Sequence, residues 1–438
     1  MSVRLTALRA LMRVIDQGQS LTAVRLWLQH SLPDARDRAF VMELTRGVLR
    51  WRWKLDALLN ACLDRPLRNR EVELRLLLQM ALYELGEMQS PDYAVVDETV
   101  KAARRLRKPW ATALTNAVLR RYVRQAETIQ QELSDEQKAS HPPWLLARLQ
   151  HDWPQHWRQI TAANNARAAL HLRVNRLQTS RDTYLQKLQQ TGLQASAHAL
   201  SDAAITLAQP LDVTALPGYQ QGEFAVQDAG AQLAAVLLDA RPGQRVLDMC
   251  AAPGGKACHV LERAGNQLDL LALDNDAERL QRVEENLARL QLDATTRVAD
   301  ATDTCWHDSV LEDGLFDRIL LDVPCSASGV IRRHPDIKSL RREQDIAALV
   351  AVQQQILRAA WRLLAPGGRL LYATCSVLNA ENSEVVAAFL AQQRDAEEWP
   401  IDAGWGLACE HGRQLLPGVD DSDGFYYALL QKHPVVAG

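Results

Sequence analysis

Two cysteines follow apolar runs that should form buried strands, and their neighbours could do chemistry on a substrate. Cys325 lies in the segment Asp322-Val-Pro-Cys-Ser326, and Cys375 lies in Ala373-Thr-Cys-Ser376. Ligands of an open α/β sheet bind beyond the carboxyl ends of its strands, so both thiols and the Asp322 carboxylate should reach one crevice. This combination suits covalent chemistry on a base ring, because a thiolate is a strong nucleophile.

A small-residue loop after an earlier expected strand could hold a cofactor. Its residues are Cys250, Ala251, Ala252, Pro253, Gly254, Gly255 and Lys256. The loop should open a helix, whose first N–H groups and dipole favour an anionic group. Asp274 follows about twenty residues later, where an acid can accept hydrogen bonds from a ribose. Asp300, after the next strand, could receive the amino group of an adenine.

The residues of this loop discriminate among three cofactors. A dinucleotide site needs Gly-x-Gly-x-x-Gly, which is absent, and in a phosphate-binding P-loop Cys250 and Ala257 would occupy the positions of a glycine and a hydroxyl residue. S-adenosylmethionine needs only a close backbone approach, a ribose acid and a helix start that tolerates its carboxylate. The pattern therefore favours S-adenosylmethionine, the alternative being a tight turn without a ligand.

The elements that must position these residues alternate between strand and helix from about residue 231 onward. Alternation of this kind predicts a doubly wound, mostly parallel α/β sheet of the Rossmann-like type. The expected strands are Arg245–Met249, Asp269–Leu273, Thr295–Val298, Phe316–Leu321, Arg369–Ala373 and Phe425–Leu430.

Two further domains are expected before this one. Residues 1–140 show apolar residues at helical spacing and predict an all-α domain, and 141–230 mix helical and strand-like patterns and predict a small α+β linking and RNA-binding module. The catalytic domain then spans 231–438. Within the mixed module, one helix is expected over Trp144–Gln159.

Composition limits the class of protein. The chain has 438 residues, of which 24% are charged and 47% hydrophobic, and no apolar run reaches the ~18 residues of a membrane helix. Its seven cysteines are scattered, which favours reduced thiols, and there is no Cys-x-x-Cys or His-x-x-x-His. We expect a cytoplasmic, monomeric protein that uses no metal.

A basic run in the first domain is a candidate RNA contact. No acid interrupts residues 101–124, although a run of this kind is often only a solvated helix face. Two arginines after the Cys325 segment could also hold phosphates near the target. The candidate RNA-binding residues are Arg104, Arg105, Arg107, Lys108, Arg120, Arg121, Arg332 and Arg333.

Taken together, the segments Cys250–Lys256, Asp322–Gly329 and Tyr372–Ser376 resemble the signature motifs of RNA 5-methylcytosine methyltransferases of the NOL/NOP/Sun family. The segments Gly222–Asp228, Val330–Asp336 and Asp423–Tyr427 extend the similarity. The helical N-terminal part is similar to the NusB-like RNA-binding domain that a bacterial family member carries, so the resemblance covers nearly the whole chain.

The resemblance implies residue roles and a substrate. Cys375 would be the nucleophile, Cys325 would assist product release, and Asp322 would contact the target base. The residues from Cys250 to Lys256, with Asp274, Asp300 and Asp322, would surround S-adenosylmethionine. The implied reaction is methyl transfer to carbon 5 of a cytosine in small-subunit (16S) ribosomal RNA, after a thiolate has added to carbon 6.

Two rival functions stay open at this point. The same chemistry could act on transfer RNA, because the motifs do not specify the RNA. The protein could also be a ribosome-assembly factor that binds RNA without catalysis, although the intact pair of Cys325 and Cys375 argues against this.

Overall fold

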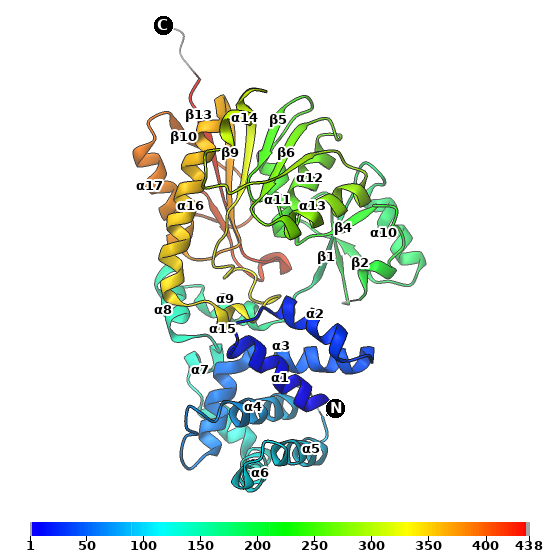
Figure 1. The fold of residues 1–438 in the computed structure, drawn as a ribbon, viewed down its shortest axis with the longest axis vertical. Helices are drawn as coiled ribbons and strands as arrows, with labels where there is room; N and C mark the ends of the chain where they lie inside the picture. Colours follow the sequence, from blue (N-terminus) through cyan, green and yellow to red (C-terminus); the bar gives the residue numbers. More distant parts are fainter. Residues whose placement is uncertain (1, 89, 210, 435–438) are drawn as a thin grey trace. The chain divides into compact units, whose positions relative to one another are not determined.

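The computed structural model describes residues 2–88, 90–209 and 211–434 (Figure 1). The chain forms two compact units, which we treat separately. Unit 1 comprises Met1–Ala166 and Ile331–Glu343, and unit 2 comprises Arg167–Val330 and Gln344–Gly438. These units divide the chain at other places than the domain limits expected at 140 and 230, which stay a prediction. Residue 1 of the first expected domain, residue 210 and residues 435–438 lie outside the described ranges, as does residue 89.

Unit 1 is all-α in the part of the chain that the structure describes. Its helices begin at polar caps: the Ser20 hydroxyl accepts from Ala23 N, and the Asp34 carboxylate accepts from Arg36 N and Asp37 N. The helices are α1 (Val3–Ile15), α2 (Leu21–Ser31), α3 (Ala35–Cys62), α4 (Val72–Glu87), α5 (Asp92–Arg104), α6 (Pro109–Glu132), α7 (Asp135–Ala139), α8 (Pro143–Asp152), α9 (Trp157–Asn165) and α15 (Ile337–Leu340).

The segment 331–343, which follows the Cys325 loop in the sequence, belongs to the core of unit 1. Lys338 is fully buried, and its Nζ donates to Arg50 O at 2.8 Å, Ser140 O at 2.9 Å and Asn165 Oδ1 at 2.5 Å. Three oxygens match the three N–H donors of an ammonium group. This segment is therefore anchored within the helical unit.

Unit 2 begins with a small α+β module. Its four strands pair in the order β2-β3-β1-β4, and every pair is antiparallel. The elements are β1 (Leu170–Val174), α10 (Arg181–Gln190), β2 (Ala195–Ala197), β3 (Ala204–Leu207), the 3-10 helix η1 (Val213–Ala215) and β4 (Phe224–Val226).

The larger sheet of unit 2 has nine strands in the order β11-β12-β13-β9-β8-β5-β6-β7, with β10 paired to β13. Strands β5 to β9 are parallel neighbours, and β13 runs antiparallel beside β9. The elements are α11 (Ala229–Leu238), β5 (Arg245–Asp248), α12 (Gly255–Arg263), β6 (Asp269–Asp274), α13 (Ala277–Leu290), β7 (Thr295–Val298), α14 (His307–Leu311), β8 (Phe316–Asp322), α16 (Glu343–Leu363), β9 (Leu364–Thr374), η2 (Asn379–Glu381), α17 (Ser383–Gln392), β10 (Ala396–Trp399), β11 (Leu407–Ala408), β12 (Arg413–Leu415), η3 (Val419–Asp421) and β13 (Phe425–Lys432).

Helices cover both faces of this sheet, and alternate side chains of one strand enter different cores. Leu371 and Ala373 of β9 pack with residues of α11, α12 and α13, whereas Leu370 and Tyr372 pack with residues of α16 and α17. This alternation is the period of two that a β-strand imposes. The doubly wound α/β sheet predicted from the sequence is confirmed, as are the all-α part and the small α+β module before it. The sheet is mixed, because strands β5 to β9 pair in parallel whereas β13 pairs antiparallel with β9, β10 and β12, and β11 pairs antiparallel with β12.

All six expected strands of the sheet are present, with ends that differ by a few residues. The single helix expected over Trp144–Gln159 is instead two helices, α8 and α9, because the chain turns at Trp153–His156 around Pro154. None of the helices in the described ranges is long and apolar enough to cross a membrane.

Candidate active site

A hollow of about 320 Å³ lies at the carboxyl ends of the parallel strands of unit 2. Ligand pockets occur at this edge of α/β sheets, and this volume is at the small end of their usual range. The site residues expected from the sequence that line it are Cys250, Ala252, Asp274, Asp300, Asp322, Cys325 and Cys375. The hollow therefore brings the expected cofactor acids and both thiols together.

The two thiols are in contact because their strands are parallel neighbours. Asp322 of β8 is in register with Ala373 of β9, and the Sγ atoms of Cys325 and Cys375 are 3.4 Å apart. Cys325 is only 7% exposed, whereas Cys375 is half-buried. The hydrogen bond with Cys375 and burial raise the pKa of Cys325, which favours the protonated form of this thiol.

A close backbone contact joins the loops that carry the thiols. Gly329 N donates to Cys375 O at 2.8 Å, and Gly424 N donates to Gly329 O at 2.8 Å. A Cβ atom at position 329 would lie 2.2 Å from Gly424 O and 2.9 Å from Cys375 O. Only glycine fits there, which explains why the segment after Cys325 ends in this residue.

Asp322 has a cationic partner from the loop after β5. Lys256 Nζ donates to Asp322 Oδ2, and the lysine side chain is 12% exposed against 29% for the aspartate. Burial has the largest single effect and lowers the pKa of Lys256, but the charge and hydrogen bond of Asp322, together with other nearby acidic groups, outweigh it, and the net pKa is raised. The raised pKa favours the charged form of Lys256, which binds one of the two carboxylate oxygens of Asp322.

Asp248, the last residue of β5, is a titratable group that the sequence reasoning missed. It is 2% exposed, and its Oδ2 atom has no hydrogen-bond partner among the described residues. Burial, followed by the charge of Asp322, raises the pKa of Asp248 to about 7. The available signal was an acid at the final position of a buried strand, directly before the small-residue loop.

The loop after β5 needs a glycine for its backbone conformation and for its close packing against α13. Gly254 has φ +95°, and a Cβ atom there would lie 3.2 Å from Val283 Cα. Asp274 accepts from Ala252 N at 3.2 Å and Asp276 N at 3.1 Å, which fixes its carboxylate at the end of β6. Asp300 accepts from Thr302 N at 2.8 Å through Oδ1.

These acids fit an adenosine-type ligand, because a ribose and an adenine amino group both donate hydrogen bonds to carboxylates. Ala251, Pro253, Gly254 and Gly255 do not line the hollow themselves, and Lys256 reaches it through Asp322. The Arg173 guanidinium holds the first residue of α12 by donating to Gly255 O at 2.5 Å. Among the described residues, no three His, Cys, Asp or Glu side chains group to hold a metal ion.

The candidate RNA-binding residues all lie in unit 1, and they differ in exposure. Arg104, Arg105, Arg107 and Arg120 are exposed, and Arg333 is half-buried. Lys108 is paired with Glu71, and Arg121 contacts Asp64 at 3.2 Å. Arg332 is 2% exposed, so a phosphate contact from it would require the segment 331–343 to rearrange. The exposed arginines at the end of α5 remain the strongest candidates.

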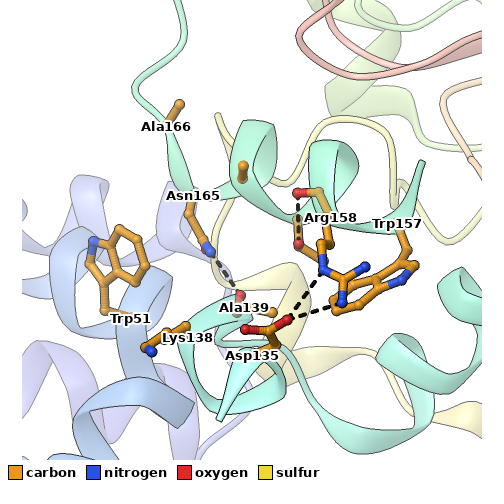
Figure 2. A pocket seen from close by; sticks show the side chains of 10 residues that line it. Trp51, Asp135, Lys138, Ala139, Trp157, Arg158, Asn165 and Ala166 are labelled. Carbon is orange, nitrogen blue, oxygen red and sulfur yellow. Dashed lines mark hydrogen bonds and ion pairs between the residues drawn. The ribbon is translucent and has the colours of Figure 1, made fainter. Parts of the chain in front are cut away.

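Unit 1 also contains a hollow of about 430 Å³ with two indoles (Figure 2). Trp51 and Trp157 line it, together with Lys138 and Arg158. Arg158 is 4.4 Å from the Trp157 ring centroid and is paired with Asp135 at 3.0 Å. Trp157 is 8% exposed, so it serves mainly in packing.

Comparison with known families supports the division into three kinds of domain. Residues 235–431 match the family described as 16S rRNA methyltransferase RsmB/F, residues 141–214 match its ferredoxin-like domain, and residues 1–124 match the NusB family. The chain is 47% identical over 435 residues to a ribosomal RNA small subunit methyltransferase B of Pseudomonas putida, covering 99% of each chain. The chain belongs to the ribosomal RNA small subunit methyltransferase B family.

Other members of the methyltransferase B family and solved structures agree. The Erwinia tasmaniensis relative is 45% identical, with 98% of this chain and 99% of the relative covered. A methyltransferase homologue from Pyrococcus horikoshii is 28% identical with a TM-score of 0.57, covering 66% of this chain and 99% of its own. The crystal structure of PH0851, 23% identical, has the same fold over 98% of both chains, with a TM-score of 0.78.

Membership of the methyltransferase B family identifies the cofactor. The protein is an S-adenosylmethionine-dependent methyltransferase, as the residues of the loop after β5 predicted. The roles of the individual residues in the hollow stay predictions.

Proposed function

We propose that this enzyme methylates carbon 5 of a cytosine in small-subunit ribosomal RNA through a covalent bond between Cys375 and carbon 6 of the base. The observation that carries the proposal is the pair of thiols, 3.4 Å apart, in the same hollow as the cofactor acids. Carbon 5 of cytosine is a weak nucleophile, and addition of a thiolate at carbon 6 converts the ring into an enamine-like species.

The two thiols have different surroundings, and these support different roles. Cys375 is half-buried and lines the hollow, so its sulfur is accessible to a base. Cys325 is buried, and its sulfur lies 3.4 Å from the Cys375 sulfur, close enough for its S–H to donate to that atom. After methyl transfer, a base from the solvent takes the carbon-5 proton, and the electron pair of that bond re-forms the double bond between carbons 5 and 6. The carbon–sulfur bond then breaks, and its electron pair returns to Cys375. Cys325 assists this step by donating to the departing thiolate.

Asp322 orients the base in this mechanism. Lys256 occupies its Oδ2 atom, which leaves Oδ1 for the exocyclic amine of cytosine. A carboxylate fixed by an ion pair loses little freedom when it binds the base, so its hydrogen bond favours the adduct.

S-adenosylmethionine supplies the electrophilic methyl group when it is bound. Asp274 and Asp300 are the acids that would bind its ribose and adenine, and the loop from Cys250 to Lys256 would lie against its amino-acid part. Arg173 supports this loop through Gly255 O.

Ribosomal RNA is proposed as the substrate because the relatives that match over 99% of the chain are named ribosomal RNA small subunit methyltransferases B. Unit 1 would bind the RNA, since its sequence matches the NusB family and exposed arginines gather at the end of α5. A target base in a duplex must be extruded to reach a thiol, so exposed or loosely folded RNA is favoured. A monomeric, cytoplasmic protein without a metal is part of the same proposal.

Trapping the covalent adduct tests the proposal. Cys325→Ala is incubated with unmodified small-subunit ribosomal RNA and S-adenosylmethionine, and a slowly migrating protein–RNA species is sought on a denaturing gel. We expect that species to accumulate, because Cys375 still attacks whereas release fails. Cys305→Ala, which removes an exposed cysteine, should turn over normally and leave no adduct.

The substrate is tested in parallel with transfer RNA. If an adduct forms with transfer RNA alone, the proposed reaction stands, but its substrate is transfer RNA. If neither RNA forms an adduct, and RNA is bound but its bases stay unmethylated, the proposal is wrong and the protein is an assembly factor that binds RNA without catalysis.

A further inference from the structure

A buried carboxylate lies between the two loops that carry the thiols. Glu381 is fully buried in η2, between β9 and α17. Its Oε1 atom accepts from Ser326 N at 2.7 Å, and its Oε2 atom accepts from Ser376 Oγ at 2.6 Å. Ser326 directly follows Cys325, and Ser376 directly follows Cys375. One carboxylate therefore binds both thiol loops at the residue next to the sulfur.

The neighbouring polar groups complete a network around the same two loops. Gln353 Nε2 of α16 donates to Glu381 Oε1 at 3.2 Å, and the hydroxyls of Ser326 and Ser328 lie 3.2 Å and 3.1 Å from Ser376 Oγ. Asn382 accepts from Thr374 Oγ1 at 2.6 Å and donates to Ser376 O at 3.0 Å. The residues on both sides of Cys375 are thus fixed as well.

Stability alone gives a poor reason for this arrangement. Moving a carboxylate out of water costs several kcal/mol, and this cost is recovered best by a cation. Among the described residues, the hydrogen-bond partners of Glu381 are an amide N–H, a hydroxyl and a glutamine side chain, all neutral. A buried carboxylate whose hydrogen-bond partners come mostly from the two loops it joins is a feature of sites where the placement of reactive groups matters.

We infer that Glu381 is a positioning residue that holds the Cys325 and Cys375 sulfurs in contact with each other. The inference rests on the proposed function for its catalytic consequence, but not for the geometry itself. A lesser consequence follows from the charge, since Glu381 is one of the groups that raise the pKa of Cys325 and so favour its protonated form. Loss of the carboxylate would let the two loops separate.

The first test measures contact between the sulfurs without any RNA. Diamide oxidises two neighbouring thiols by accepting their two hydrogens, and the two sulfurs then form one S–S bond. Mass spectrometry measures how fast the linked Cys325–Cys375 peptide forms, and this rate depends on how close the two sulfurs are. We expect Glu381→Gln to slow this linkage at least tenfold. The matched control is Glu384→Gln, three residues away in α17 and exposed, which should leave the rate unchanged.

The second test uses methylation by the same variants. Glu381→Gln keeps the size of the side chain and one acceptor oxygen, and misplacement of a reactive group by about 1 Å costs on the order of 100-fold in rate. We expect a loss of that size in kcat with little change in the KM for S-adenosylmethionine, and a pH profile of product release that moves to lower pH. Ser376→Ala removes the hydrogen bond between the Cys375 loop and Glu381 but retains the carboxylate. This variant should lower both the rate of S–S linkage and kcat.

The outcomes separate this inference from the proposed function. A linkage rate and kcat equal to wild type in Glu381→Gln would overturn the inference. A loss of kcat that comes with lower thermal stability, weaker cofactor binding and an unchanged pH profile would also overturn it, because Glu381 would then only support the fold. If no RNA is methylated by the wild-type enzyme but linkage still depends on Glu381, the proposed function fails and the positioning role stands.

Discussion

The two units hold their charged side chains in different ways. In unit 2, Asp248, Lys256 and Glu381 are largely buried and point toward one hollow or the loops around it. In unit 1, Arg104 and Arg105 are exposed. The interaction energy of buried charged groups is large and depends on their positions. Exposed charges are screened by salt, and one can replace another with little change in energy. Removal of one group in unit 2 should therefore abolish a step, and removal of one in unit 1 should change only an affinity.

The largest effect is expected from Cys375→Ala, which removes the proposed nucleophile from unit 2. Without the nucleophile, neither the adduct nor the methylated product forms, and kcat should fall by at least ~10⁴-fold, as losses of covalent nucleophiles do. Methylation is measured by transfer of a labelled methyl group to RNA, and cofactor binding should stay within about threefold of wild type. A residual rate within tenfold of wild type would assign the attack to another residue.

Gly329→Ala is expected to have the next largest effect, since it disturbs both thiol loops together. The added Cβ atom would lie 2.2 Å from Gly424 O, so the backbone of the Cys325 loop must move. A shift of about 1 Å at reacting groups costs on the order of 100-fold in rate. The matched control is Gly404→Ala, because Gly404 has no heavy atom within 4 Å of the added Cβ position. Equal kcat values for both variants would show that the close contact is not needed.

Asp248→Asn tests whether a buried charge in unit 2 lowers the free energy of unfolding. Burial raises the pKa of Asp248 to about 7, whereas an aspartate in an unfolded chain has a pKa of about 4. The folded state therefore holds the proton more tightly, and this contribution to stability is complete below pH 4 and lost as the pH rises through 7. At ~1.4 kcal/mol per pH unit the loss amounts to roughly 4 kcal/mol at most.

The measurement is the urea concentration at the midpoint of unfolding for wild type and Asp248→Asn at pH 5 and pH 8. The asparagine variant does not titrate, so its stability relative to wild type should improve between the two pH values. Asp402→Asn, at an exposed aspartate of the same unit, should show no such change. A difference that is constant with pH would mean that Asp248 is already charged at pH 5.

The same contrast explains how much the sequence could predict. Chemistry in unit 2 needs particular residues at particular spacings, so Cys325, Cys375 and Asp274 were recognisable before the fold was known, and the parallel strands followed from alternating patterns. Glu381 was not recognisable, because a carboxylate in a loop looks solvated until the fold shows the N–H and hydroxyl groups around it. Arg332 was misleading for the opposite reason, since a basic residue in a loop is here buried in unit 1.

The smallest effect is expected at the end of α5 in unit 1, where the arginines are exposed. The triple change Arg104→Gln, Arg105→Gln and Arg107→Gln removes charges at the end of α5 and should raise the KM for RNA about three- to tenfold, with kcat unchanged. If each arginine contacts a phosphate, the slope of log affinity against log salt should fall by about three, because each lost contact releases about one fewer counterion.

The control removes the same amount of charge elsewhere in unit 1, by Arg36→Gln, Arg65→Gln and Arg68→Gln, all at exposed arginines. An equal loss in both triples would mean that the net charge of the unit attracts RNA and that the end of α5 is not a binding surface. A loss confined to the first triple would locate the RNA there. In that case the two units divide the work, since unit 1 contributes affinity through exposed charge and unit 2 contributes chemistry through buried charge.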